Sequence, residues 1–60
     1  MLELHYTQRG KKITCIITEY KDKECKTLFH ASVDIEDALK FLCDTKEIYL
    51  KFLEEQYHAD

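Results

Sequence analysis

Residues 2–17 read LELHYTQRGKKITCII, and this stretch decides the fold class. Apolar and polar residues alternate on both sides of Arg9-Gly10 with the period of two that is typical of half-buried strands. A turn centred on Arg9-Gly10 makes every cross-strand pair on one face apolar, and Gly10 supplies the positive φ that such a turn requires. The predicted pairs are Tyr6 with Ile13, Leu4 with Cys15, and Leu2 with Ile17. The sequence therefore predicts a β-hairpin.

A third strand is predicted over about residues 25–33, where apolar residues occur on both faces. If residues 22–24 form a three-residue loop, the core face continues onto this strand. The predicted pairs are then Ile17 with Phe29, Cys15 with Ala31, and Ile13 with Val33. A two-residue turn would instead pair Cys15 with His30, and an unpaired polar group in a core costs about 1–3 kcal/mol. We therefore predict the three-residue loop.

The opposite face of this sheet mixes apolar groups with two histidines. Its members are His5, Thr14, Ile16, Thr18, Tyr20, Leu28 and His30. A sheet face that exposes Ile16, Tyr20 and Leu28 is a candidate surface for contact with a partner. The alternative, of equal weight, is that these are scattered surface hydrophobes.

From Asp34 onwards the apolar period changes to 3.6 residues, which predicts a helix over about residues 35–57. Asp34 is its expected cap, and Glu36 and Asp37 place carboxylates in the first turn. One apolar stripe is expected to lie on the sheet. It contains Ile35, Ala38, Leu39, Leu42, Tyr49, Leu53 and Tyr57.

A second stripe, made of Phe41, Ile48 and Phe52, lies well away from the first and has the spacing of a helix–helix seam. We expect it to be buried against a partner, because three exposed side chains of this size forgo about 1.5–3 kcal/mol each. The homodimer predicted from this argument uses these three residues, the sheet face with Ile16, Tyr20 and Leu28, or both.

The predicted helix is about 35 Å long, whereas strands of about seven residues span about 23 Å, so the helix would overhang its sheet. Residues 44–47 (Asp-Thr-Lys-Glu) resemble a capping box, and a second helix beginning at Asp44 would remove the overhang. No glycine or proline enforces a break there, so we favour a continuous helix or one kinked near Asp44. The prediction is a single α+β domain over residues 1–60, a three-stranded antiparallel β-meander followed by an amphipathic helix.

Composition bounds the chemistry that this chain supports. Sixty residues, 45% of them hydrophobic, make one small ordered domain with a thin stability margin. Three cysteines without close spacing predict reduced thiols and a cytoplasmic location, and paired zinc ligands are absent from the sequence, so no metal or cofactor is expected. No apolar run reaches the length of a membrane span. No motif organises a nucleophile and a base, so we expect no enzymatic activity.

Charge is divided unevenly along the chain. Residues 1–33 carry six basic and four acidic side chains, whereas residues 34–60 carry three lysines and eight acids. The basic residues do not cluster on one face, which argues against direct binding of duplex nucleic acid. Arg9, Lys11 and Lys12 at the first turn are the residues that would carry this alternative function.

These observations predict a small acidic adaptor or regulator that acts by binding another protein. A bacterial or phage-encoded inhibitor of a host protein is one form of such a regulator. A nucleic-acid-binding regulator that uses the first turn, or a structural subunit of a larger assembly, are the alternatives.

Overall fold

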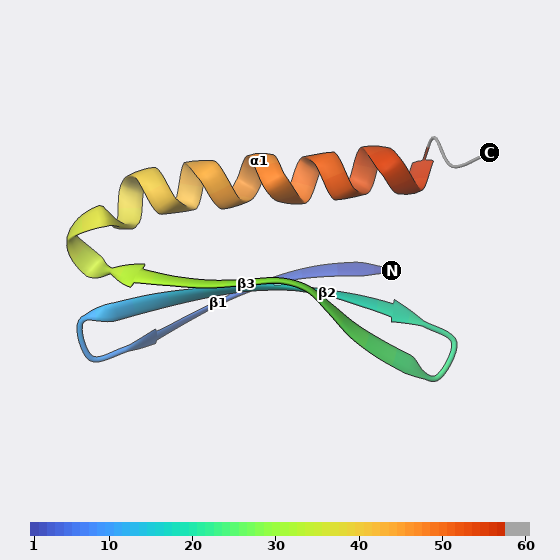
Figure 1. Ribbon diagram of the computed structural model, residues 1–60, viewed down its shortest axis with the longest axis horizontal. Coiled ribbons are helices and arrows are strands. Elements are labelled where there is room, and N and C mark those ends of the chain that lie inside the picture. The colour runs from blue at the N-terminus through green and yellow to red at the C-terminus, as the bar shows by residue number, and fades with distance from the viewer. Residues whose placement is uncertain (58–60) are drawn as a thin grey trace.

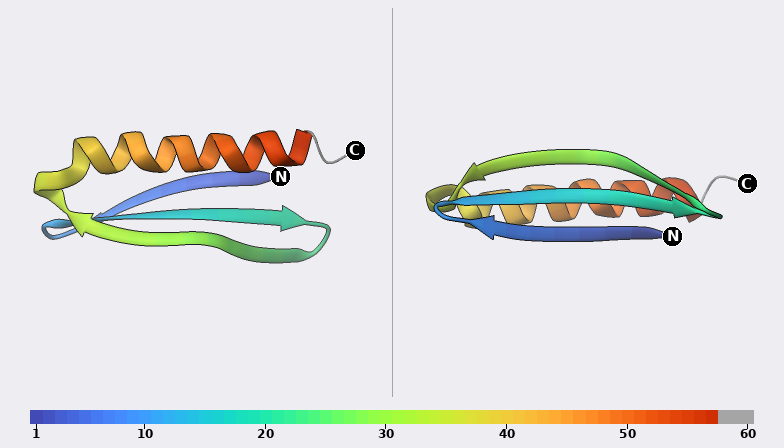
Figure 2. Two further views of the ribbon diagram at one scale, coloured as in Figure 1. Left: turned by 45° about the horizontal axis from the view of Figure 1, so that its top comes forward. Right: turned by 90° about the horizontal axis from the view of Figure 1, so that it is seen from below.

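The computed structural model describes residues 1–57 and contains one sheet and one helix (Figure 1). The elements follow in the order β1 (Leu2–Arg9), β2 (Lys12–Lys21), β3 (Glu24–Asp34), a short 3₁₀ turn η1 (Ile35–Asp37) and α1 (Ala38–Tyr57). The strands form an antiparallel sheet in the order β1-β2-β3. Helix α1 runs along one face, and nothing in residues 1–57 covers the other face (Figure 2). The predicted α+β meander with a C-terminal helix is confirmed.

The first hairpin has a register two residues away from the predicted one. Tyr6 lies opposite Cys15 and Leu4 opposite Ile17, and the connection is the two-residue turn Gly10-Lys11. Gly10 does have positive φ, at 61°, as predicted. A shift of two residues keeps every side chain on its face, so the alternation in the sequence fits both registers equally well. Turn chemistry decides between them, because glycine at the first central position suits a two-residue hairpin turn.

The second hairpin combines the two pairings that the sequence offered. Ile17 lies opposite Phe29, Cys15 opposite Ala31 and Ile13 opposite Val33, so the predicted core pairs are confirmed. The predicted three-residue loop is wrong, because Lys21 pairs with Glu24 across a two-residue turn. A β-bulge between these regions takes up the extra residue, Leu28. Such a bulge turns neighbouring side chains to the same face, so Leu28 joins Phe29 on the helix side instead of the uncovered face.

Helix α1 is continuous through Asp44, and no second helix begins there. The predicted overhang is absent because the strands are longer than expected. They contain 8, 10 and 11 residues, so the longest spans about 36 Å, whereas the 20-residue helix spans about 30 Å. Asp34 makes no side-chain capping hydrogen bond. The chain enters η1 instead through a backbone bond in which Ile35 N–H donates to Lys11 O at 2.8 Å.

The face of α1 that packs on the sheet is centred on the second stripe, and of the stripe predicted to lie there Tyr49 packs against the core. Phe41 is 8% exposed and belongs to the core with Cys15 and Ile17, while Ile48 and Phe52 pack against that core. Leu39, assigned from the sequence to the sheet side, is 83% exposed. Both stripes are apolar, and periodicity alone does not say which one faces the sheet.

A polar group lies in the middle of the buried face of α1. Thr45 is 1% exposed, and its hydroxyl donates to Phe41 O at 2.8 Å and lies within hydrogen-bond distance of the Tyr6 hydroxyl. Since the single threonine proton goes to Phe41 O, Tyr6 is the donor to Thr45. A second tyrosine, Tyr49, donates to Leu2 O on the outer edge of β1 at 3.4 Å. Two tyrosine hydroxyls therefore tie β1 to the helix.

Candidate interaction surface

The outward face of α1 carries a row of largely exposed apolar side chains. We call this row the outer stripe, and it consists of Leu39, Leu42, Leu50, Leu53 and Tyr57. Leu39 and Tyr57 are 83% and 79% exposed, Leu50 and Leu42 are 46% and 37% exposed, and Leu53 is half-buried. The row runs from one end of the helix to the other, which distinguishes it from scattered surface hydrophobes.

The interface residues predicted on the helix pack within this chain. Phe41 is buried, and Ile48 and Phe52 are half-buried against the core, so the premise that they lie exposed is wrong. Two apolar stripes occur because α1 is apolar on both sides of a narrow charged strip that contains Asp44, Glu47 and Lys51. The exposed apolar side chains of α1 are instead those of the outer stripe.

The uncovered face of the sheet is more polar than predicted, since Leu28 has moved to the helix side. Ile16 is half-buried between His5 and His30 on the neighbouring strands, and Tyr20 is 37% exposed. Two side-chain hydrogen bonds lie on this face. Thr14 on β2 bonds to Ser32 on β3 at 2.7 Å, and His5 bonds to Glu3 within β1 at 2.9 Å. The charge of Glu3, aided by desolvation and by Cys25, raises the pKa of Tyr20. This face therefore offers hydroxyl and imidazole groups with little apolar area.

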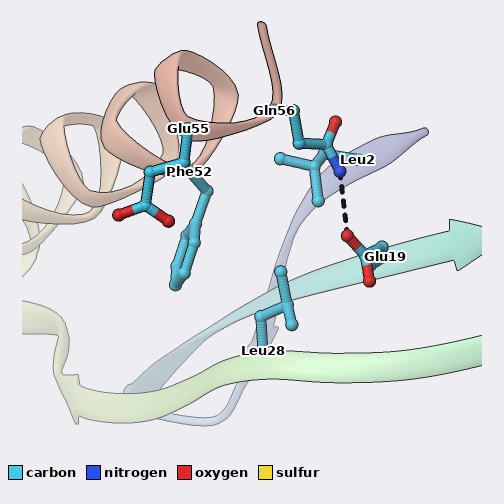
Figure 3. A pocket seen from close by; sticks show the side chains of 6 residues that line it. All are labelled: Leu2, Glu19, Leu28, Phe52, Glu55 and Gln56. Carbon is cyan, nitrogen blue, oxygen red and sulfur yellow. Dashed lines mark hydrogen bonds between the residues drawn. The ribbon is translucent and has the colours of Figure 1, made fainter. Parts of the chain in front are cut away.

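A hollow of about 260 Å³ opens between the last turns of α1 and the sheet (Figure 3). Its apolar lining comes from Leu2, Leu28 and Phe52, which point toward one another from three different elements. Gln56 donates to Glu19 at its rim at 2.9 Å. The hollow is open, and Phe52, which lines it, also packs against the domain core. We therefore interpret the hollow as incomplete packing at the edge of the core.

The basic turn lies beside acidic groups. Lys12 Nζ is 3.6 Å from the Asp34 carboxylate, and Lys11 lines one depression together with Asp34 and Glu36. Arg9 pairs with Lys12 across the turn. The carboxylates of β3 and η1 reduce the positive potential of this turn, which sequence spacing alone does not reveal.

The three thiols lie in different environments. Cys15 is fully buried, and this burial raises the pKa of its thiol, while hydrogen bonds with Thr45 and Tyr6 act in the opposite direction. A thiol with a raised pKa is a poor nucleophile at neutral pH. Cys25 and Cys43 are exposed and free, so only Cys15 belongs to the core.

Two further findings concern residues 1–57. No group of three or more histidine, cysteine or acidic side chains there is arranged to hold a metal ion. Helix α1 is 20 residues long, but no helix in the described part of the chain is apolar enough to cross a membrane.

The outer stripe is the feature that sequence reasoning misplaced, although its signal is present in the sequence. Four members of the outer stripe, together with two other residues of the same face, are spaced at intervals of four, three, four, three and four residues. We call these six the seam positions: Leu39, Cys43, Lys46, Leu50, Leu53 and Tyr57. That is the spacing of a helix–helix seam.

Comparisons with protein families, curated proteins and solved structures found no match to this chain.

Proposed function

We propose that this protein acts by binding another protein chain, as a small acidic adaptor or regulator, and that the outer stripe of α1 is its contact surface. The observation that supports this proposal is the exposure of four large apolar side chains, with the half-buried Leu53 beside them, along one face of a single helix. Contiguous apolar patches on small domains mark interaction sites, because leaving them in water forgoes the free energy of burial.

Charge around the outer stripe supports a protein partner. The helix carries its carboxylates on the strip between the outer stripe and the sheet side, including Asp44, Glu47 and Glu54. An apolar centre bordered by charged groups is the usual anatomy of a protein–protein interface.

The nucleic-acid alternative receives less support from the geometry. Its candidate residues Arg9, Lys11 and Lys12 lie next to Asp34 and Glu36, and Lys12 already has a carboxylate partner. A structural subunit of a larger assembly would use the same outer stripe, so it is a special case of the proposal.

A photo-crosslinking experiment in native lysate tests the contact surface. A benzoyl-phenylalanine side chain is introduced at position 50, on the outer stripe, and separately at position 51, on the adjacent charged strip, where Lys51 is exposed. We expect covalent protein adducts from position 50 and few from position 51. Equal adducts from both positions, no protein adduct from position 50, or adducts with nucleic acid alone would overturn the proposal.

A further inference from the structure

We infer that the occupant of the outer stripe is a second copy of this chain, whose α1 lies antiparallel to the first. This inference rests on the proposed function, since it names the partner of the same surface. Three features of the helix support it: the spacing of the seam positions, the residue pairs that this spacing brings together when the helix is reversed, and the charges beside them.

The spacing comes first. The six seam positions are spaced alternately four and three residues apart, and their five intervals average 3.6 residues, close to the 3.5 of a heptad repeat. A repeat of this kind keeps a row of side chains facing a neighbouring helix along its whole length. The seam begins at Leu39, the second residue of α1, and ends at Tyr57, its last residue. The seam therefore uses the full helix, and a partner helix of about the same length fits it.

The match on reversal comes second. Antiparallel alignment about residue 48 brings every seam position opposite another seam position. Leu39 lies opposite Tyr57 of the second copy, Cys43 opposite Leu53 of the second copy, and Lys46 opposite Leu50 of the second copy. The large Tyr57 is thus matched with Leu39, and the small Cys43 with Leu53. The long Lys46 side chain covers Leu50 with its methylenes while its ammonium group reaches solvent.

Charge decides the direction. In a parallel pair Lys46 would face Lys46 of the second copy within the seam, which is unfavourable. In the antiparallel pair Lys40, on the flank of the seam, faces Glu54 of the second copy, and this attraction occurs twice in the dimer. Glu47 meets Glu47 of the second copy near the two-fold axis, and the two Lys46 side chains beside this pair offset the repulsion. The opposed helix dipoles also favour antiparallel packing.

The remainder of the fold leaves room for this arrangement. The sheet lies on the inward side of α1 (Figure 1), so two copies pair back to back in the order sheet, helix, helix, sheet. A two-fold interface of this kind is closed, which accounts for a second copy rather than a growing chain of copies.

Sedimentation of the purified full chain tests whether a second copy is the occupant. We expect a dimer at micromolar concentration. Leu50→Lys should raise the dimer dissociation constant by roughly a hundredfold, because two buried leucines are lost and each new lysine faces Lys46 of the other copy. Ile35→Lys is the matched control, since Ile35 is a large apolar residue of similar exposure, 39%, that lies outside the seam. Circular dichroism of both variants verifies that the fold is retained.

Disulfide trapping tests the direction. In a Cys25→Ser background, Leu53→Cys places a thiol opposite Cys43 of the second copy, and diamide should then link the copies rapidly. Lys51→Cys, off the seam, should link them slowly. Rapid linking through Cys43 alone, in the background variant without Leu53→Cys, would show a parallel pair and overturn the antiparallel order.

The two proposals fail in different ways. A purified chain that sediments as a monomer at high micromolar concentration overturns the second copy as occupant. If position 50 then crosslinks to a different protein in lysate, the outer stripe remains a protein-binding surface. Absence of both self-association and crosslinking overturns both proposals.

Discussion

Thr45 is the least expected residue in the core of this protein. It is a hydroxyl group on the buried face of a helix, and its proton is used within the helix by Phe41 O. This leaves its oxygen free to accept from Tyr6 on β1. Cys15 completes the cluster from β2. No buried side-chain polar atom of the described residues lacks a hydrogen-bond partner, so the cluster is fully satisfied.

Replacing this hydroxyl should cost stability through its partner. Thr45→Val keeps the shape and should lower the free energy of unfolding by about 1–2 kcal/mol, because the hydrogen bonds of this hydroxyl with Phe41 O and Tyr6 are both lost. Tyr6→Phe should cost a similar amount. The double variant should lose less stability than the two single variants lose together. The difference, measured by urea unfolding, should be at least about 0.5 kcal/mol. Strict additivity would mean that the two hydroxyls do not interact.

The buried thiol of Cys15 predicts a loss of stability at alkaline pH. Its pKa lies above the ordinary 9.0, chiefly through burial. Below that pH the thiol is neutral in the folded and the unfolded chain. As pH rises through about 9, the unfolded chain loses the proton first, so the free energy of unfolding falls. Chemical unfolding between about pH 8 and 9.5 should show this fall.

The Cys15→Ala variant should have a flatter pH profile over this range, whatever its absolute stability. Cys25→Ser, which changes an exposed thiol, is the control and should keep the fall. A profile for Cys15→Ala as steep as that of the unchanged protein would assign the alkaline loss to other groups.

At the scale of elements, the bulge at Leu28 reconciles a tight turn with the register of the core. Deleting Leu28 leaves Thr27 opposite Thr18 and Phe29 opposite Ile17, so every other pair is kept. We expect this deletion variant to fold, with a loss of about 1–2 kcal/mol for one half-buried leucine. Deleting His30 is the contrasting variant. It moves Ser32 beside the core or Phe29 to the uncovered face, and it should destabilise the protein more in thermal unfolding.

The two faces of α1 predict opposite responses to truncation. Phe41→Ala removes a buried ring and should cost about 3–5 kcal/mol, enough to unfold a domain of this size. Leu39→Ala removes an exposed side chain and should change the unfolding free energy by less than about 0.5 kcal/mol in dilute protein. Thermal melts at low micromolar concentration measure both. The reverse order would restore the sheet-facing stripe that the sequence suggested.

The strands and the helix can be predicted from the sequence. The register between strands and the face that the helix turns to the sheet depend on features that the apolar pattern does not encode. Alternation from Leu2 to Ile17 predicts strands, and the change of period after Asp34 predicts the helix. A shift of two residues at Gly10, or a bulge exchanged for a longer loop, leaves that pattern unchanged. The choice between the two stripes of α1 depends on side-chain packing, since Phe41 fits beside Cys15 and Ile17. The capping-box pattern of residues 44–47 does not indicate that Thr45 lies on the buried face of a continuous helix.

At the scale of the whole molecule, the domain is a thin slab whose Cα atoms extend over 40 × 23 × 10 Å. A two-layer domain with one covered sheet face buries few side chains completely. Among residues 1–57, the buried apolar side chains are only Leu2, Cys15, Ile17 and Phe41. Association that hides the outer stripe would therefore supply a large share of the stability.

The melting temperature should accordingly depend on protein concentration. If two copies pair through α1, raising the concentration stabilises the folded dimer by mass action and raises the melting temperature. Leu50→Lys should melt at a lower temperature that no longer changes with concentration. A melting temperature of the unchanged protein that stays constant from low micromolar to millimolar concentration would contradict the dimer.

The two tyrosine bonds between β1 and α1 also bear on the order in which the chain folds. They join residues 39 and 47 positions apart, whereas each hairpin closes a turn of two residues. Short loops close at a lower entropic cost, so both hairpins are favoured to form before the helix docks. Docking of α1 is then the late step, and the contacts of Tyr6 and Tyr49 govern how fast the native protein opens more than how fast it forms.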